Sequence, residues 1–171
     1  METANDFFRY IQEIIQQLED DELPVQIIEE SEQPLYGELN DYILNFFAEC
    51  INQKPYGSSN SLLEEAIAFF ESKGIRGTDI DKLVLPENQY YNWNHSILFL
   101  SLGRNNRQSE ILKNFGCSLA YDQTHITSQL NRASLQLKID HYNRIFPDKI
   151  GGKRRKYTRR KKSRRYKTNG V

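Results

Sequence analysis

The chain has 171 residues, of which 23 are basic and 23 acidic, so its formal net charge is zero. Hydrophobic residues make up 38% of it, enough for a folded core, yet no apolar run approaches the roughly 18–20 residues that cross a bilayer. Its N-terminus lacks the basic and apolar stretches of a signal peptide, so we expect an intracellular protein that is neither secreted nor membrane-spanning.

Two amphipathic helices are predicted at the start of the chain. Apolar residues at helical spacing predict the first over residues 5–18, where Thr3 and Asp6 form a capping box. The same spacing predicts the second over residues 37–53. The intervening residues 24–34 are acidic and bounded by prolines, which predicts a loop.

A third helix is predicted after the turn-forming residues 55–60. Ser61 and Glu64 have the spacing of a second capping box, and Gly74 is well placed as the C-terminal cap. Residues 1–75 together have a net charge of −13, against +2 for residues 76–152. We expect the acidic first half to be repelled by nucleic acid, so that any such contact falls in the second half of the chain.

Shorter elements follow, and then one long helix. We expect a helical turn at residues 78–85, a helix over 93–102 and another over 108–115, which Gly116 closes. The longest helix is predicted from Asp122 or Thr124 to about residue 146. Its apolar stripe begins with Ile126, Leu130, Ala133 and Leu137. A stripe of this kind is typical of a central packing helix.

No alternating strand pattern is present, so the sequence predicts an all-α fold, a single compact bundle of six to seven helices. Residues 1–150 form the predicted acidic helical domain, and residues 151–171 a disordered polybasic tail. The distant cysteines Cys50 and Cys117 indicate small buried hydrophobes in a reducing compartment.

Residues 108–132 resemble a helix-turn-helix motif, with a helix, a glycine turn and a second helix that begins with polar residues. The residues that the resemblance would place at base edges are Thr124, His125, Thr127, Ser128 and Arg132. The segment 119–123 makes the turn longer than the usual three or four residues. The alternative is an ordinary pair of core helices.

The sequence contains no clear motif of a catalytic or metal-binding site. His125 and His141 lie sixteen residues apart on one predicted helix, roughly 24 Å, so they cannot share a metal ion. There is no glycine-rich phosphate loop, GxSxG or HExxH motif. We expect a non-enzymatic protein without catalytic residues, metal or cofactor.

The C-terminal tail carries the clearest functional pattern. Residues 153–171 contain eleven Lys or Arg and no carboxylate, which leaves the first 152 residues with a net charge of −11. Lysine and arginine neutralise phosphates, and tyrosine stacks on unpaired bases. The predicted nucleic-acid-binding residues are Lys153, Arg154, Arg155, Lys156, Tyr157, Arg159, Arg160, Lys161, Lys162, Arg164, Arg165, Tyr166 and Lys167. Nothing in this segment reads base sequence, so the predicted binding is non-specific.

Two other interpretations of the tail stay open. Clusters of basic residues also serve as nuclear-import signals, and this use is compatible with nucleic-acid contact. The tail could instead only keep the protein soluble, or rest on the acidic residues 1–75.

The tail sequence GGKRRKYTRRKKSRRYK, residues 151–167, resembles the Gly-Gly-then-basic C-terminal tails of many predicted proteins from large DNA viruses of protists. The resemblance implies a viral gene product, located in the host nucleus, at the viral replication site or in the virion. We expect an accessory or structural protein whose tail binds nucleic acid. The alternative is an acidic helical module that binds a protein partner, with the tail serving only to engage a nuclear import receptor. The oligomeric state stays open.

Overall fold

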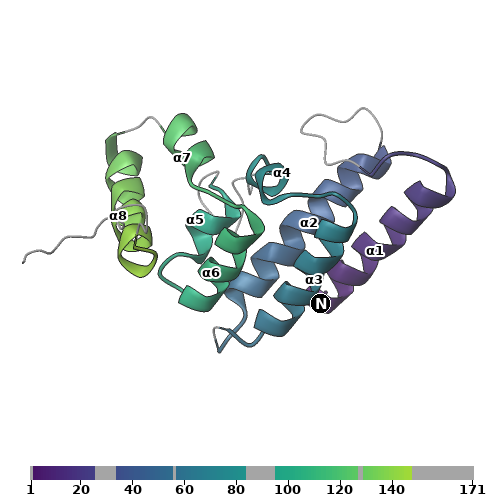
Figure 1. Ribbon diagram of the computed structural model, residues 1–171, viewed down its shortest axis with the longest axis horizontal. Helices are drawn as coiled ribbons and strands as arrows, with labels where there is room; N and C mark the ends of the chain where they lie inside the picture. The colour runs from purple at the N-terminus through teal and green to yellow at the C-terminus, as the bar shows by residue number, and fades with distance from the viewer. Residues whose placement is uncertain (1, 26–33, 56, 84–94, 127–128, 148–171) are drawn as a thin grey trace, which may run out of the picture. The chain divides into compact units, whose positions relative to one another are not determined.

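The computed structural model describes residues 2–25, 34–55, 57–83, 95–126 and 129–147, and all regular structure in these ranges is helical (Figure 1). This confirms the predicted all-α class. The helices are α1 (Ala4–Asp20), α2 (Pro34–Asn52), α3 (Asn60–Ser72), α4 (Gly77–Asp81), α5 (Ile97–Ser101), α6 (Asn106–Phe115), α7 (Ala120–His125) and α8 (Gln129–Ile145). The described residues form eight helices, against the expected six or seven. The difference arises because the last predicted helix is divided into α7 and α8.

The chain forms two compact units, Met1–Lys138 and Ile139–Val171. The first unit contains α1 to α7 and the first part of α8. In the second, the described residues are the end of α8 and the two that follow, where the rings of Tyr142 and Phe146 meet edge to face at 5.1 Å. The predicted domain boundary near residue 150 stays a prediction.

The first helix has the predicted start and the predicted buried face. The Thr3 hydroxyl accepts the Asp6 N–H at 3.3 Å, and the Asp6 carboxylate accepts the Thr3 N–H at 2.9 Å, which confirms the capping box. The buried side chains are Ala4, Phe7, Phe8, Ile11, Ile14, Ile15 and Leu18. This face packs on α2, and α1, α2 and α3 lie side by side (Figure 1).

Phenylalanine rings connect four helices through the core. The Phe8 ring of α1 lies 5.7 Å from Phe46 of α2, and Phe46 lies 6.5 Å from Phe70 of α3. Phe70 in turn stacks on Phe115 of α6 at 6.4 Å. Phe46 and Phe70 are fully buried. The contact between Phe70 and Phe115 extends this aromatic packing from the acidic first half to α6 in the second half.

The third helix begins two residues earlier than predicted. Its N-cap is Ser59, so Ser61 lies inside the first turn and the predicted Ser61–Glu64 capping box is wrong. Ser59 is buried and makes no side-chain cap bond. The predicted glycine at the other end is confirmed, since Gly74 adopts φ +80° and follows the C-cap.

Two glycines bring α4 and α6 into backbone contact. Gly116 ends α6 in the left-handed region, at φ +111°, as the sequence predicts. A Cβ atom on Gly77, the first residue of α4, would lie 2.4 Å from the Gly116 carbonyl carbon and 2.5 Å from the Cys117 nitrogen. Glycine at position 77 is therefore a packing requirement.

The predicted long helix over residues 122–146 is wrong. α7 ends at His125 because Ile126 has extended backbone (φ −86°, ψ 112°), and α8 begins at Gln129. Since the two segments do not share one helical register, Ile126 and Leu135 are buried, whereas Leu130 and Leu137 are 80% and 71% exposed. The stripe predicted to face the core is therefore largely exposed.

Candidate functional site

The predicted nucleic-acid-binding residues of the tail, Lys153 to Lys167, lie outside the described residues. Their role stays a prediction that depends on composition and charge.

The residues of the helix-turn-helix resemblance do not begin one helix. Thr124 and His125 are the last two residues of α7, and the Thr124 hydroxyl donates to the Ala120 carbonyl of its own helix at 2.9 Å. Thr127 and Ser128 lie outside the described residues. Arg132 lies in the first turn of α8 and donates to the Ile126 carbonyl at 3.0 Å. The expected recognition helix starting at Thr124 is wrong, because the helix that follows Gly116 ends there.

The first unit contains a buried polar connection between α5 and α7. The Asp122 carboxylate accepts the Ser96 N–H at 3.0 Å and the Ser96 hydroxyl at 2.5 Å. The Ser96 oxygen in turn accepts the Phe99 N–H at 3.2 Å, which caps α5. Ser96 and Asp122 are 0% and 1% exposed, so this pair fixes the start of α5 from inside the protein.

A second buried aspartate lies at the end of α4. Asp81 accepts the Ser118 N–H at 3.0 Å and the Ser118 hydroxyl at 3.3 Å, both on Oδ2. Burial raises the pKa of Asp81 to about 6, the hydrogen bonds from Ser118 lower it, and the nearby Asp122 charge adds to the rise. Asp81 therefore keeps its proton to a higher pH than an ordinary aspartate does.

His95 completes a serine, histidine and aspartate cluster, but the arrangement is that of a helix cap. Its ring stacks on Phe99 with centroids 3.8 Å apart, and its Nδ1 lies 3.5 Å from the Asp122 carboxylate. In a hydrolase triad the histidine lies between the serine and the aspartate. Here the aspartate lies between the other two, and the buried Ser96 hydroxyl is already bonded to Asp122 and to the α5 backbone.

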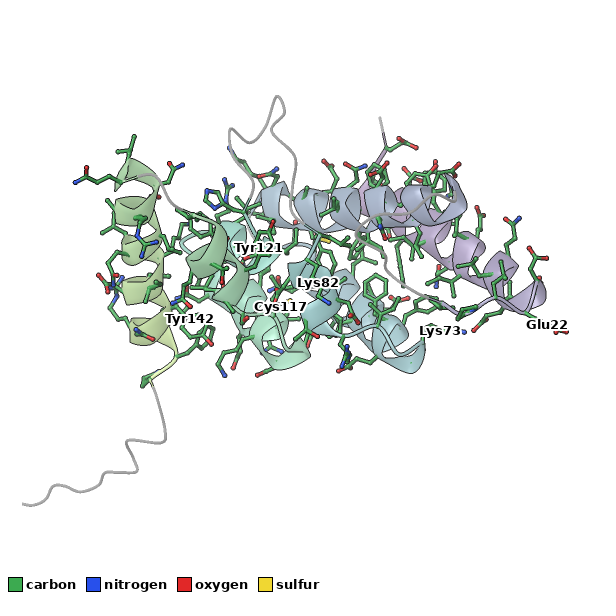
Figure 2. The ribbon with its side chains drawn as sticks, turned by 90° about the horizontal axis from the view of Figure 1, so that it is seen from above. Glu22, Lys73, Lys82, Cys117, Tyr121 and Tyr142 are labelled. Carbon is green, nitrogen blue, oxygen red and sulfur yellow. The ribbon has the colours of Figure 1, made fainter. Side chains whose placement is uncertain are left out.

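Among the described residues, no group of three or more His, Cys, Asp or Glu side chains is arranged to hold a metal ion. Both thiols are free and buried, and burial raises the pKa of Cys50 to about 12 and that of Cys117 well above its usual range. Figure 2 shows Cys117 in the interior of the first unit. Neither thiol is an activated nucleophile.

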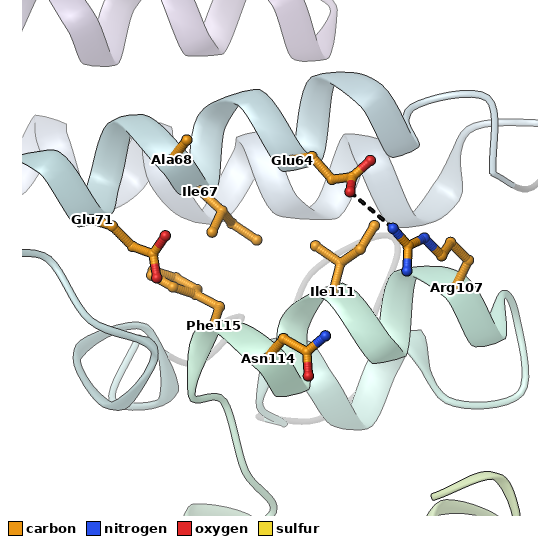
Figure 3. A pocket seen from close by; sticks show the side chains of 8 residues that line it. All are labelled: Glu64, Ile67, Ala68, Glu71, Arg107, Ile111, Asn114 and Phe115. Carbon is orange, nitrogen blue, oxygen red and sulfur yellow. Dashed lines mark hydrogen bonds and ion pairs between the residues drawn. The ribbon is translucent and has the colours of Figure 1, made fainter.

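A groove of about 210 Å³ lies between α3 and α6 (Figure 3). Its lining residues are Glu64, Ile67, Ala68, Glu71, Arg107, Ile111, Asn114 and Phe115. Arg107 bridges Glu64 at 2.9 Å and Glu110 at 2.7 Å. Four of its lining side chains are apolar, and the charged Glu64, Glu71 and Arg107 stand beside them, so the groove would suit a small apolar group with a polar neighbour.

A wider cavity of about 350 Å³ lies against α8. Its lining residues are His95, Leu130, Asn131, Ala133, Ser134 and Leu137. This surface was not predicted from the sequence, because the helical spacing assigned the two leucines to the core. The buried aspartates were not predicted either. The contact of Ser96 with Asp122 had one local indication in the sequence. Ser96 stands directly before the apolar residues of α5, where a serine N-cap is expected.

Comparison with protein-family models, with curated proteins and with solved structures finds no match to this chain. The helices among the described residues are all too short or too polar to span a bilayer.

Proposed function

We propose that this protein binds nucleic acid without sequence specificity through its polybasic C-terminal tail. The observation that carries the proposal is the distribution of charge. Eleven of the nineteen residues from 153 to 171 are Lys or Arg and none is a carboxylate, while the rest of the chain has a net charge of −11. Phosphate contacts by such a segment release counterions and supply affinity for any DNA or RNA.

The acidic body of the protein, residues 1–152, also supports contact with nucleic acid through the tail alone. Exposed carboxylates such as Glu13, Glu19 and Asp20 line the solvent face of α1. They repel phosphates, so they confine contact to the tail and keep the body away from the nucleic acid. One of them is partly neutralised, since Lys73, the C-cap residue of α3, lies 2.9 Å from Glu19 near the C-terminal end of α1.

The test is nucleic-acid binding across a salt series. It compares the full chain with a full-length variant in which the eleven tail Lys and Arg are replaced by Gln, on random duplex and single-stranded DNA. If six to ten charges contact phosphates, the affinity of the natural chain falls roughly 10³–10⁵-fold between 50 and 200 mM salt. The variant is expected to lose binding and its salt dependence.

Equal binding by both proteins would place the nucleic-acid contact in the body. Absence of binding by the natural chain at low salt would overturn the proposal. A matched control replaces eleven exposed acidic residues outside the tail by Gln or Asn, which should leave the salt slope unchanged.

A second function is favoured by the groove between α3 and α6. In this alternative the acidic body binds a protein partner, and the tail serves only as a nuclear-targeting signal read by an import receptor. The two functions separate in cells. If the tail serves only for nuclear import, a protein in which an unrelated nuclear signal replaces residues 153–171 should keep its function. If the tail binds nucleic acid, this protein should lose its function.

The resemblance of the tail extends the proposal to an accessory or structural product of a large DNA virus, present in the host nucleus, at the replication site or in the virion. Fractionation of infected cells and of purified virions with an antibody to the body tests this location. Absence from the nucleus, from the replication site and from purified virions would contradict it.

A further inference from the structure

The groove between α3 and α6 has two chemically different ends (Figure 3). At one end, Arg107 bridges Glu64 at 2.9 Å and Glu110 at 2.7 Å, so its charge is already paired. Glu71 and Phe115 line the other end, and Glu71 follows Glu64 by two turns of α3, roughly 10 Å. Among the described residues, no basic side chain pairs with the Glu71 carboxylate. The groove therefore holds one carboxylate without a cation.

The basic side chain nearest to Glu71 along the chain is used elsewhere. Lys73 lies 2.9 Å from Glu19 of α1, and residues two apart on a helix point in different directions. With Glu110 included, the groove has three carboxylates, Glu64, Glu71 and Glu110, against the single guanidinium of Arg107, which leaves a charge of −2. A cation that enters the groove is therefore attracted to it.

The floor of the groove suits an alkyl chain. Ile67, Ile111 and Phe115 are buried apolar residues at its base, and the small side chain of Ala68 is exposed beside them. Lysine and arginine lay their methylene stems on apolar surfaces and keep the charged head at a polar group. The volume of about 210 Å³, the apolar floor and the Glu71 carboxylate together match one such side chain.

The tail of this chain consists largely of such side chains. Residues 153–171 contain eleven Lys or Arg and no carboxylate, whereas the rest of the chain has a net charge of −11. The acidic body of one copy therefore attracts the tail of another, and any of eleven side chains can supply the stem and the cation. Because the groove and the tail are different surfaces, the contact joins two copies head to tail.

We propose that the groove between α3 and α6 binds a Lys or Arg side chain from the tail, residues 153–171, of a second copy of this chain, with its cation paired to Glu71. The proposal does not depend on the proposed function, although nucleic acid would compete for the same tail.

The first test measures binding of a labelled peptide with the sequence of residues 151–171 by fluorescence anisotropy at low salt. The receiving protein is the full chain with its eleven tail Lys and Arg replaced by Gln, so its own tail does not compete. Glu71→Gln in this protein should weaken binding about two- to fivefold, the effect of losing one exposed ion pair. Glu65→Gln is the matched control, because it removes an exposed carboxylate of the same helix that does not line the groove.

Two further changes test the groove itself. Ala68→Arg places a bulky cation over the floor and should weaken peptide binding at least about tenfold. A peptide in which 2,4-diaminobutyric acid replaces every Lys and Arg keeps eleven cations but shortens their stems. It should bind more weakly than the natural peptide, because a short stem cannot cover the floor and still reach Glu71. Positions 65, 68 and 71 are exposed, so the protein variants should stay folded, which circular dichroism verifies.

Sedimentation of the natural chain tests whether the tail comes from a second copy. At low salt the chain should self-associate as its concentration rises, and both Ala68→Arg and an excess of the peptide should reduce this association. Binding of duplex DNA by the Ala68→Arg variant of the natural chain should keep its salt dependence, which separates this contact from nucleic-acid binding.

Four outcomes overturn the proposal. The peptide could fail to bind at low salt. Equal losses from Glu65→Gln and Glu71→Gln would show a general attraction to the acidic body and not a contact in the groove. Unchanged binding by Ala68→Arg, or equal binding of the shortened peptide, would exclude a side chain on the floor. A natural chain that stays monomeric at high micromolar concentration would exclude the second copy.

Discussion

The Asp122 carboxylate binds the backbone N–H and the hydroxyl of Ser96, 26 residues earlier in the chain, and thereby fixes the start of α5 to α7. Both groups are shielded from water, and the Ser96 oxygen uses its remaining capacity to cap α5. One carboxylate therefore satisfies two buried donors at once.

Loss of this carboxylate should destabilise the protein strongly. Asp122→Ala leaves the Ser96 N–H and hydroxyl buried without their partner, at an expected cost of about 3 kcal/mol in the free energy of unfolding. Urea unfolding followed by far-ultraviolet circular dichroism measures it. Asp41→Ala, which removes an exposed carboxylate of α2, should change the free energy by less than about 0.5 kcal/mol. Equal effects of the two changes would contradict the structural role of Asp122.

Asp81 should make stability depend on pH with an unusual sign. Its pKa rises from 3.8 to about 6 on folding, so between these values the folded protein binds more protons than the unfolded chain. Asp81 therefore stabilises the fold most below pH 4 and loses this contribution as the pH rises through 6. The difference is on the order of 3 kcal/mol. Relative to the natural chain, Asp81→Asn should gain stability as the pH increases from 4 to 7. A difference independent of pH would show that Asp81 titrates normally.

The contact between Gly77 and Gly116 predicts a contrast between two glycines. Gly77→Ala places a methyl group 2.4 Å from backbone atoms that cannot move aside, so we expect a loss of about 3 kcal/mol. Gly74→Ala meets nothing within 4 Å and costs only the strain of the left-handed region, about 1 kcal/mol. Thermal unfolding of both variants tests the order, and a larger effect at Gly74 would be inconsistent with the close approach.

The exposed stripe predicts a second contrast, within α8. Leu135 is 3% exposed, so Leu135→Ala should cost about 2–4 kcal/mol. Leu137→Ala should change the free energy of unfolding of the monomer by less than about 0.5 kcal/mol, because its side chain is 71% exposed. Urea unfolding at low protein concentration measures both losses. Equal losses at both positions would mean that Leu137 is packed in solution.

The tyrosines of the tail predict a preference between nucleic acids. The double variant Tyr157→Leu and Tyr166→Leu keeps all eleven charges but removes both rings. Binding to single-stranded DNA should weaken by about 1–3 kcal/mol for each ring that stacks on a base, whereas binding to duplex DNA should be unchanged. Fluorescence anisotropy with labelled oligonucleotides distinguishes the two. Equal losses on both substrates would argue against stacking.

The sequence predicted those parts of the fold that depend on local rules. The Thr3 capping box, the buried face of α1 and the glycines that follow α3 and α6 all depend on residues within one or two turns, and all are confirmed. The start of α3 was missed because Ser59 and Ser61 are both acceptable caps. The helix uses Ser59 although its side chain makes no cap bond, so local cap preference does not determine this start.

The failures share a physical cause, since they depend on contacts between distant segments. A helix over residues 122–146 fits the spacing of its apolar residues, but extended backbone at Ile126 ends α7 and removes Leu130 and Leu137 from the core. The pairing of Asp122 with Ser96 and of Asp81 with Ser118 spans 26 and 37 residues, which no local pattern reveals. The predicted tail site lies outside the described residues, so its assignment still depends on charge alone.

Because Cys50 and Cys117 are buried, the reaction of their thiols can be used to measure local opening of the fold. A water-soluble thiol reagent can modify Cys50, in α2, or Cys117, after α6, only when the surrounding structure opens. The rate of modification at each position therefore measures how often that part of the fold opens under native conditions. Because Cys50 lies beside Ser59 at the start of α3 and Cys117 beside Gly77 of α4, the two rates compare local opening at two separate helix junctions without any mutation.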